Sequence, residues 1–174
     1  MPQLVDTHCH LNFDAYQEDR EEVLARAREV GVERVLVPAI DLASSRQILA
    51  LAEDYAGLYA AVGVHPNSAG RWTAGRVEEL REAAQHPRVK AIGEIGLDYY
   101  HDRTSHSHQK EVLVSQLGLA SSLNLPVVLH VRNAQESDRS CIIDLLDVLS
   151  DWRSQTESEG EHARGVIHSF SGNW

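Results

Sequence analysis

The sequence predicts an α/β fold of the (β/α)8 TIM-barrel type, with about six βα units in this chain. Short β-branched apolar runs alternate with amphipathic helical stretches, which is typical of βαβ crossovers and a parallel sheet. The runs are apolar throughout, as in strands covered on both faces. Histidine and acidic side chains follow one predicted strand after another. A closed barrel brings such strand ends to one mouth, whereas an open doubly wound sheet spreads them across its width.

The predicted strands are short runs rich in Val, Ile and Leu, residues that suit a buried pleated surface. They are expected at residues 3–6, 34–38, 58–64, 89–92, 126–130 and 166–168. The strand over 89–92 runs into the segment Gly93-Glu94-Ile95-Gly96-Leu97-Asp98.

Helices are predicted where apolar residues recur every three or four positions. They are expected at residues 17–30, 41–55, 73–84, 105–123 and 137–149. Asp41 and Thr73 stand at two helix starts as N-caps, and Gly31 and Gly57 follow two helix ends. We expect polar residues 151–162 to form a loop or a frayed helix end. In the preceding helix, the residues expected to be buried are Cys141, Ile142, Leu145 and Leu146.

Composition indicates one soluble intracellular domain over residues 1–174. The formal net charge of −10 argues against a broad basic surface for nucleic acid, although bound metal ions can supply positive charge locally. Cys9 and Cys141 lie far apart, which suits a reducing cytoplasm better than a disulfide framework. No apolar run approaches the length of a membrane span, and no basic segment followed by an apolar core opens the chain. We therefore expect a cytoplasmic location.

The first predicted strand leads into Val5-Asp6-Thr7-His8-Cys9-His10-Leu11. On a strand, His8 and His10 would share one face while Cys9 points away, so the two imidazoles form the start of a divalent-metal site. A pair of solvated histidines is the alternative, and this pattern by itself does not decide between them. Later strand ends add Glu94, His130 and His168.

Together these residues offer four imidazoles and one carboxylate. Imidazole suits Zn²⁺, Fe, Ni or Mn, and a carboxylate can bridge two ions. Two divalent ions about 3.5–4 Å apart stabilise both the attacking and the leaving oxygen in hydrolysis, and a metal lowers the pKa of bound water to about 7. The five positions therefore predict a metal-dependent hydrolase.

Five segments in order resemble the signatures of the TatD family of metal-dependent deoxyribonucleases, which are amidohydrolase-like barrels. These segments are D-T-H-C-H-L (6–11), G-V-H-P (63–66), G-E-I-G-L-D-Y-Y (93–100), P-V-V-L-H-V-R-N-A (126–134) and G-V-I-H-S-F-S-G (165–172). The resemblance implies one TatD-type hydrolase domain over 1–174, acting on single-stranded DNA as a 3′-5′ exonuclease.

The same resemblance implies a site for two divalent ions, Mg²⁺, Mn²⁺ or Zn²⁺. His8 and His10 would hold one ion, and His130 and His168 the other. Glu94 would bridge the two ions as the catalytic carboxylate. Two other functions stay open: hydrolysis of a small ester, lactone or amide, and a truncated barrel that binds metal or a partner without turnover.

Other polar residues near strand ends are weaker candidates. His65 either contacts a phosphate or orders its loop. Arg132 and Asn133 are candidates for substrate binding, since a guanidinium can grip a phosphate with two hydrogen bonds. Asp98 either orients a ligand or caps the local structure. Tyr99 and Tyr100 pack at the rim or stack on a base, and the residues expected to be solvated are His101, His106 and His108.

The chain departs from the family pattern after its sixth strand. A complete barrel of this type needs about 250 residues, and this sequence has 174. Relatives carry an aspartate at the seventh strand end that ligates the metal held by the first histidine pair, and no residue here matches it. We expect a truncated barrel whose two exposed sheet edges favour association. A fragment completed by another chain and a shortened natural form with reduced activity are the alternatives.

Overall fold

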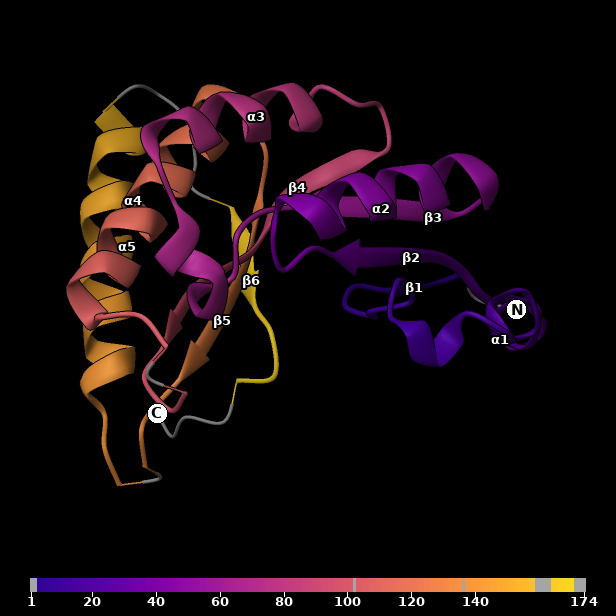
Figure 1. The fold of residues 1–174 in the computed structure, drawn as a ribbon, viewed down its shortest axis with the longest axis horizontal. Helices are drawn as coiled ribbons and strands as arrows, with labels where there is room; N and C mark the ends of the chain where they lie inside the picture. Colours follow the sequence, from indigo (N-terminus) through magenta and orange to yellow (C-terminus); the bar gives the residue numbers. More distant parts are fainter. Residues whose placement is uncertain (1–2, 102, 136, 159–163, 171–174) are drawn as a thin grey trace.

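The computed structural model describes residues 3–101, 103–135, 137–158 and 164–170. Its core is one parallel sheet whose strands follow one another in chain order (Figure 1). The strands are β1 (Leu4–Asp6), β2 (Val32–Pro38), β3 (Leu58–Val62), β4 (Val89–Asp98), β5 (Val127–Arg132) and β6 (Gly165–Ile167). The α-helices are α1 (Arg20–Glu29), α2 (Leu42–Asp54), α3 (Ala74–Ala84), α4 (His106–Ser122) and α5 (Ser140–Ser158). Two short 3₁₀ helices are η1 (Asp14–Tyr16) and η2 (Pro66–Arg71).

This topology confirms the predicted fold class. Every strand pairs in parallel with its neighbour in the sequence, so each crossover moves one place along the sheet. A doubly wound sheet instead reverses its strand order at a switch point. Helices α2 to α5 lie along the outer side of the curved sheet (Figure 1), and neighbouring helices contact one another in chain order. The six strands therefore form a curled half-barrel.

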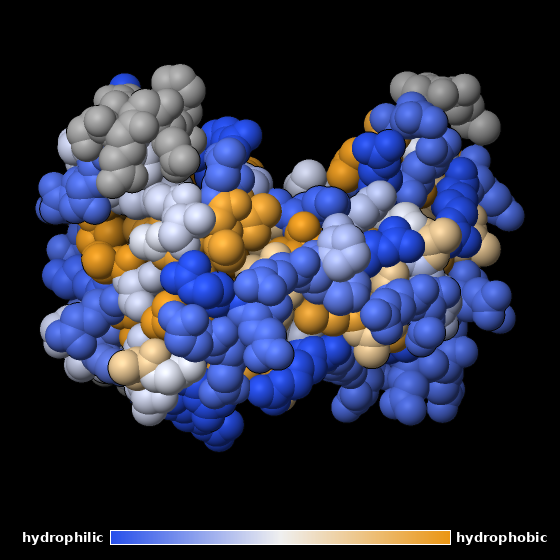
Figure 2. Space-filling view, turned by 90° about the horizontal axis from the view of Figure 1, so that it is seen from above, coloured by the Kyte–Doolittle hydropathy of each residue, from blue (hydrophilic) through white to orange (hydrophobic). Residues whose placement is uncertain are grey.

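Burial is deepest in the middle of the sheet and lowest at its edges. Ala60, Val62 and Ile92 on β3 and β4 are inaccessible to solvent, whereas Val5 on β1 is 55% exposed and Val166 on β6 is 45% exposed. Figure 2 shows hydrophobic residues gathered across the centre of one face, within a mostly hydrophilic surface that is hollowed between two raised ends. This distribution follows from a sheet that curls without closing, because β1 and β6 each have a single neighbour among the described strands.

Several predicted boundaries are wrong. Helix α5 runs to Ser158, so the part of the expected loop up to that residue is helical, while residues 159–162 lie outside the described part. Leu146, expected to be buried, is 53% exposed. The buried face of α5 instead continues through Trp152, whose Nε1 donates to Ser121 Oγ at 2.7 Å on α4. Strand β4 continues through Glu94 to Asp98, because β5 pairs with it as far as Arg132.

Two buried glutamines on α4 hold the chain at the ends of β3 and β4. Gln116 accepts from the backbone N–H of Val64 at 2.8 Å and donates to the same residue's carbonyl at 3.0 Å. Seven residues earlier on the same face, Gln109 makes the equivalent pair of bonds to Asp98 at 2.8 and 3.0 Å. Each glutamine amide thus pairs with the backbone N–H and carbonyl of one residue, as a neighbouring strand would. The two fixed points stand directly beside His65 and within the segment that carries Glu94.

Candidate metal centre

Glu94 lies at the centre of a cluster of histidines at the carboxyl ends of the strands. Its side chain is 4% exposed. One oxygen, Oε2, lies 3.5 Å from Nε2 of both His8 and His10. The other, Oε1, lies 2.6 Å from His168 Nε2 and 3.0 Å from His130 Nδ1. A single carboxylate therefore faces two separate pairs of imidazoles.

The first pair lies just beyond β1. That strand ends at Asp6, so the expectation that both histidines lie on a strand is wrong. The carboxylate of Asp6 accepts from the backbone N–H of His8 at 3.0 Å, and this bond turns the chain where the strand stops. The Nε2 atoms of His8 and His10 nevertheless lie 3.3 Å apart, and the ring of Phe13 stacks on His10 at 4.7 Å. The pair converges on the same carboxylate oxygen through this local turn.

The second pair comes from β5 and from the residue after β6. His130 Nδ1 and His168 Nε2 lie 3.3 Å apart. The other ring nitrogen of His130, Nε2, lies 3.2 Å from Asp98 Oδ2. His168 also stacks on His8, with ring centroids 3.9 Å apart. Because of the curl, the carboxyl ends of the two edge strands meet in this stack.

The spacing of these atoms fits divalent cations. In each of two groups, His8–His10–Glu94 and Glu94–His130–His168, the candidate ligand atoms all lie within 4.8 Å of one another. Two nitrogens bound tetrahedrally to one zinc ion at about 2.0–2.1 Å would lie about 3.3–3.4 Å apart, which matches both histidine pairs. Within the described residues, buried Nδ1 of His8 and of His10 has no hydrogen-bond partner. The donor set therefore fits two ions that share Glu94.

The carboxylates and imidazoles of the cluster strongly shift one another's pKa values. Burial raises the pKa of Glu94, but hydrogen bonds from the surrounding histidines outweigh burial and hold that pKa well below its ordinary value. Burial lowers the pKa of His130, yet hydrogen bonds to Asp98 and Glu94 outweigh it and raise the pKa to about 9. The carboxylates thus stabilise positive charge here, and a cation that binds His130 displaces its proton.

His65 lies inside this cluster and not at its rim. Its Nε2 is 3.8 Å from Glu94 Oε1, and its Nδ1 accepts from the backbone N–H of Asn67 at 3.1 Å. Burial, reinforced by nearby His130, lowers the pKa of His65 to about 4. The imidazole is therefore neutral at pH 7, with its proton on Nε2 and directed toward Glu94.

The predicted ligand set leaves out three polar residues that lie in the cluster, namely Asp98, Asn67 and His101. Asp98 accepts from Asn67 Nδ2 at 3.1 Å and lies 2.7 Å from His101 Nδ1. Burial raises the pKa of Asp98, but hydrogen bonds from His130 and His101 outweigh it and lower the pKa. His65, Asp98 and His130 form a third close group of potential ligands. Strand alternation carries a signal for Asp98, because it follows Glu94 by four positions and shares its face.

Of the three histidines expected to be solvated, His101 and His106 are exposed and His108 is half-buried, and all three have partners. His101 contacts Asp98, as described above, and the ring of His106 stacks on Tyr99 at 3.4 Å between centroids. His108 Nε2 lies 3.2 Å from the carbonyl oxygen of Ala69. Sequence spacing gave no sign of these contacts, which depend on how the loop after β4 folds back.

The two candidate substrate-binding residues after His130 direct their side chains to partners outside the histidine cluster. The Arg132 guanidinium sits 3.9 Å from the ring centroid of exposed Tyr100. Asn133 Oδ1 accepts from the backbone N–H of Ile142 at 3.3 Å, near the start of α5. Tyr99 is buried, and its hydroxyl donates to Asp144 at 2.6 Å. A substrate contact by Arg132 or Asn133 stays a prediction.

A curled parallel sheet with a histidine and carboxylate cluster at its strand ends is the architecture of a barrel-type metal-dependent enzyme. Comparison with known proteins agrees. The family model described as TatD related DNase matches residues 5–174. This chain therefore belongs to the TatD family, as its sequence signatures predicted.

Individual relatives cover nearly all of this chain. It is 37% identical to "Uncharacterized metal-dependent hydrolase YabD" of Bacillus subtilis, over 98% of this chain and 62% of the relative. It is 34% identical to "3'-5' ssDNA/RNA exonuclease TatD" of Escherichia coli, over 97% of this chain and 60% of the relative. The crystal structure of YjjV, a TatD homolog from Escherichia coli, matches with a TM-score of 0.83 and 35% identity, over 98% of this chain and 61% of that one. The chain thus spans about three fifths of the length of these relatives.

No helix among the described residues is long and apolar enough to cross a membrane. Both cysteines are free in the structure, with Cys141 buried and Cys9 partly buried.

Proposed function

We propose that this protein is a divalent-metal-dependent hydrolase that cleaves phosphodiester bonds of single-stranded DNA as a 3′-5′ exonuclease. The observation that carries the proposal is the Glu94 carboxylate, whose two oxygens face separate histidine pairs. In this proposal the first pair, His8 and His10, holds one ion. The second pair, His130 and His168, holds the other, and Glu94 binds both.

The ions in this proposal are Mg²⁺, Mn²⁺ or Zn²⁺. When bound, such ions polarise a phosphoryl oxygen and lower the pKa of water to about 7. The protein's own residues fix the geometry around them. Asp98 accepts from His130 Nε2 and so directs Nδ1 toward Glu94, as outer partners of metal ligands do. Neutral His65 presents an N–H to the same carboxylate.

The names of several relatives, which are called ssDNA/RNA exonucleases, support nucleic acid as the substrate. Others are named only as metal-dependent hydrolases. Because the chain carries a net charge of −10, contact with a polyanion must be confined to the neighbourhood of the metal centre. The two free cysteines support a reducing, cytoplasmic setting for this activity.

Substitution Glu94→Gln tests the proposal. It removes the charge that both half-sites share while keeping the side chain's size. We expect loss of bound metal and a fall of more than about 100-fold in cleavage of a single-stranded oligonucleotide with Mg²⁺ or Mn²⁺, because even outer partners of metal ligands contribute 10- to 100-fold. Metal content is measured by elemental analysis, and cleavage by gel electrophoresis of an end-labelled strand.

Glu111→Gln is the matched control, because the Glu111 side chain is 73% exposed on α4. Equal cleavage by the two variants would overturn the shared-carboxylate assignment. Turnover of small esters, lactones or amides by a protein that leaves DNA intact would replace the proposed substrate.

A further inference from the structure

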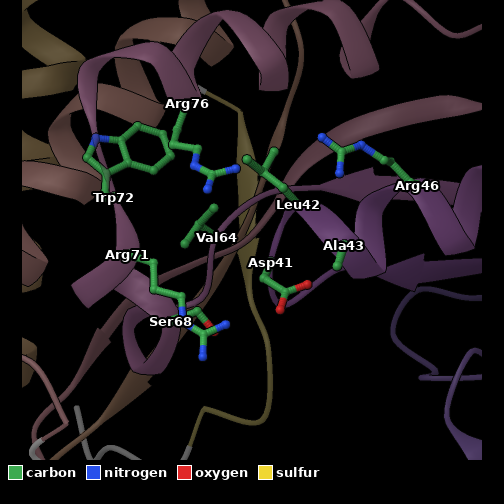
Figure 3. A pocket seen from close by; sticks show the side chains of 9 residues that line it. All are labelled: Asp41, Leu42, Ala43, Arg46, Val64, Ser68, Arg71, Trp72 and Arg76. Carbon is green, nitrogen blue, oxygen red and sulfur yellow. The ribbon is translucent and has the colours of Figure 1, made fainter.

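Three arginines and a tryptophan line one cavity of about 150 Å³ (Figure 3). We call it the arginine pocket, defined by Arg46, Arg71, Trp72, Arg76, Leu42 and Val64. Its polar walls come from α2, η2 and the first turn of α3, and its apolar walls are Leu42, Val64 and the indole. In Figure 3 the Arg76 guanidinium extends between the Trp72 ring and Leu42.

The pocket borders the metal centre on the mouth side of the sheet. Val64, in its wall, directly precedes His65, which lies 3.8 Å from Glu94. A wider hollow shares Asp41 and Ala43 with the pocket and reaches Phe13, the ring that stacks on His10. The arginine pocket lies at the carboxyl ends of β2 and β3, and the wider hollow lies at those of β1 and β2. Because β2 and β3 are inner strands of the described sheet, the pocket itself is not formed by an open edge.

Charge in the pocket is positive on a protein that is acidic overall. Glu79 pairs with Arg46 at 2.9 Å and with Arg76 at 3.3 Å, so one carboxylate serves two guanidinium groups. Asp41 accepts from the backbone N–H and the hydroxyl of Ser44 and caps α2. Within the part of the chain that the structure describes, no hydrogen bond or ion pair engages the Arg71 guanidinium. The pocket therefore has spare cationic capacity beside an aromatic face.

A ligand that satisfies these walls needs an anionic group and a flat ring. Guanidinium groups bind phosphate with paired hydrogen bonds, and aromatic side chains stack on bases of single-stranded nucleic acid. Pockets for drug-sized ligands measure about 300–1,000 Å³, so this cavity admits a fragment such as one base ring. A free phosphate would leave the indole and apolar walls without a role.

We propose that the arginine pocket binds one nucleotide of the single-stranded substrate beside the scissile bond, with its base against Trp72 and its phosphate on Arg71 and Arg76. This inference rests on the proposed function and names the substrate contact that the acidic chain needs. The wider hollow extends from Asp41 and Ala43 of the pocket to Phe13, whose ring stacks on His10.

Binding measured without catalysis tests the proposal. A labelled single strand of about ten nucleotides, a length within known single-strand site sizes, is titrated with the protein in EDTA and followed by fluorescence anisotropy. We expect Arg71→Ala to weaken binding about ten-fold and to reduce the slope of log affinity against log salt by about 0.7, the value for one phosphate contact on a single strand. Trp72→Ala should weaken binding by a similar factor, while Trp72→Phe keeps an aromatic face and most of the affinity.

The matched control is Arg28→Ala. Arg28 is an exposed arginine at the end of α1 whose guanidinium donates to the Ala56 carbonyl, so the variant loses the same charge at the opposite end of the strands. Its affinity and salt slope should equal those of the unaltered protein. Circular dichroism of each variant separates lost binding from lost folding.

Two outcomes separate this inference from the proposed function. If Arg71→Ala and both Trp72 variants bind like the unaltered protein, while DNA is cleaved with unchanged KM, the arginine pocket is overturned and the nuclease proposal stands. If the pocket variants lose binding but the unaltered protein cleaves no nucleic acid with any divalent metal, the pocket stands as a nucleotide site and the nuclease proposal fails.

Discussion

At the scale of single residues, the strongest determinant of the candidate site is the orientation of His130. Nothing in its own strand selects which ring nitrogen faces Glu94. The choice is made by Asp98, which takes the hydrogen bond from Nε2 at 3.2 Å and leaves Nδ1 free to face the carboxylate. Asp98 is inaccessible to solvent and is itself held by Asn67 and His101. Metal binding requires less free energy to order a ligand whose orientation is already fixed.

The substitution Asp98→Asn tests this positioning role. The amide keeps the shape of the side chain but can donate to His130 Nε2 and so favour the wrong tautomer. We expect metal affinity to fall about 10- to 100-fold, the usual effect of losing an outer partner of a ligand. Titration calorimetry with Mn²⁺ or Zn²⁺ measures the affinity. Asp147→Asn, at an exposed position on α5, is the control, and equal affinities in the two variants would contradict the role assigned to Asp98.

The residues at this scale divide into those that the sequence could reveal and those that it could not. The four histidines lie near or just after the ends of β1, β5 and β6, and Glu94 lies within β4. The structure brings all five together, although their role as metal ligands stays a prediction. Asn67 and His101 carry no such signal. Their contacts with Asp98 arise only when the loops after β3 and β4 fold back over the mouth.

At the scale of elements, α4 positions the site through polar side chains on its buried face. Gln109 and Gln116 occupy positions where a helical pattern leads one to expect apolar residues, and each is 1% exposed. Their spacing of seven residues, two turns of helix, places both on the face toward the sheet. Periodicity predicted the helix itself correctly, over 105–123 against the observed His106–Ser122. It missed the glutamines, because hydropathy treats a buried polar residue as a surface one.

Gln116→Leu should destabilise the fold. Leucine fills most of the volume but leaves the N–H and the carbonyl of Val64 buried without partners. Each unsatisfied buried group costs about 1–3 kcal/mol, so we expect the free energy of unfolding to fall by about 2–4 kcal/mol. Urea denaturation followed by circular dichroism measures it.

Gln85→Leu provides the comparison, since Gln85 is exposed at the end of α3 and should change stability by less than about 0.5 kcal/mol. If both leucine variants unfold at the same urea concentration as the unaltered protein, α4 does not hold the end of β3 in the way described.

At the scale of the whole molecule, the sheet formed by the described strands curls without closing. Strands β1 and β6 are the edges of this described sheet, and the exposed apolar residues Leu4, Val5 and Val166 lie on them. Unpaired edge strands are templates for pairing with other chains. Strand order and barrel type were predictable from the positions of the potential metal ligands. These residues lie near the carboxyl ends of several strands, and they can meet only if those strand ends converge. The longer β4 and α5 were not predictable, since their last residues are held by pairing and packing with distant segments.

We expect the chain by itself to associate through these edges in a concentration-dependent manner. A charge at an edge discourages such pairing, so Val5→Lys should shift the chain toward monomer in analytical ultracentrifugation. Val114→Lys on α4 is the matched control, because both valines are 55% exposed. A monomer at every concentration, or an equal shift with both lysine variants, would exclude association through β1.

The stack of His8 on His168 has a topological consequence. It joins the first and last described strands, so the path from one histidine to the other closes into a ring that contains nearly the whole fold. Closing such a ring costs entropy that grows only with the logarithm of its length. A ligand held between the two histidine pairs would keep the ring closed, and its binding energy would add to the stability of every unit in between. The fraction of protein with ligand bound between the histidine pairs and the free energy of unfolding would then report on the same equilibrium.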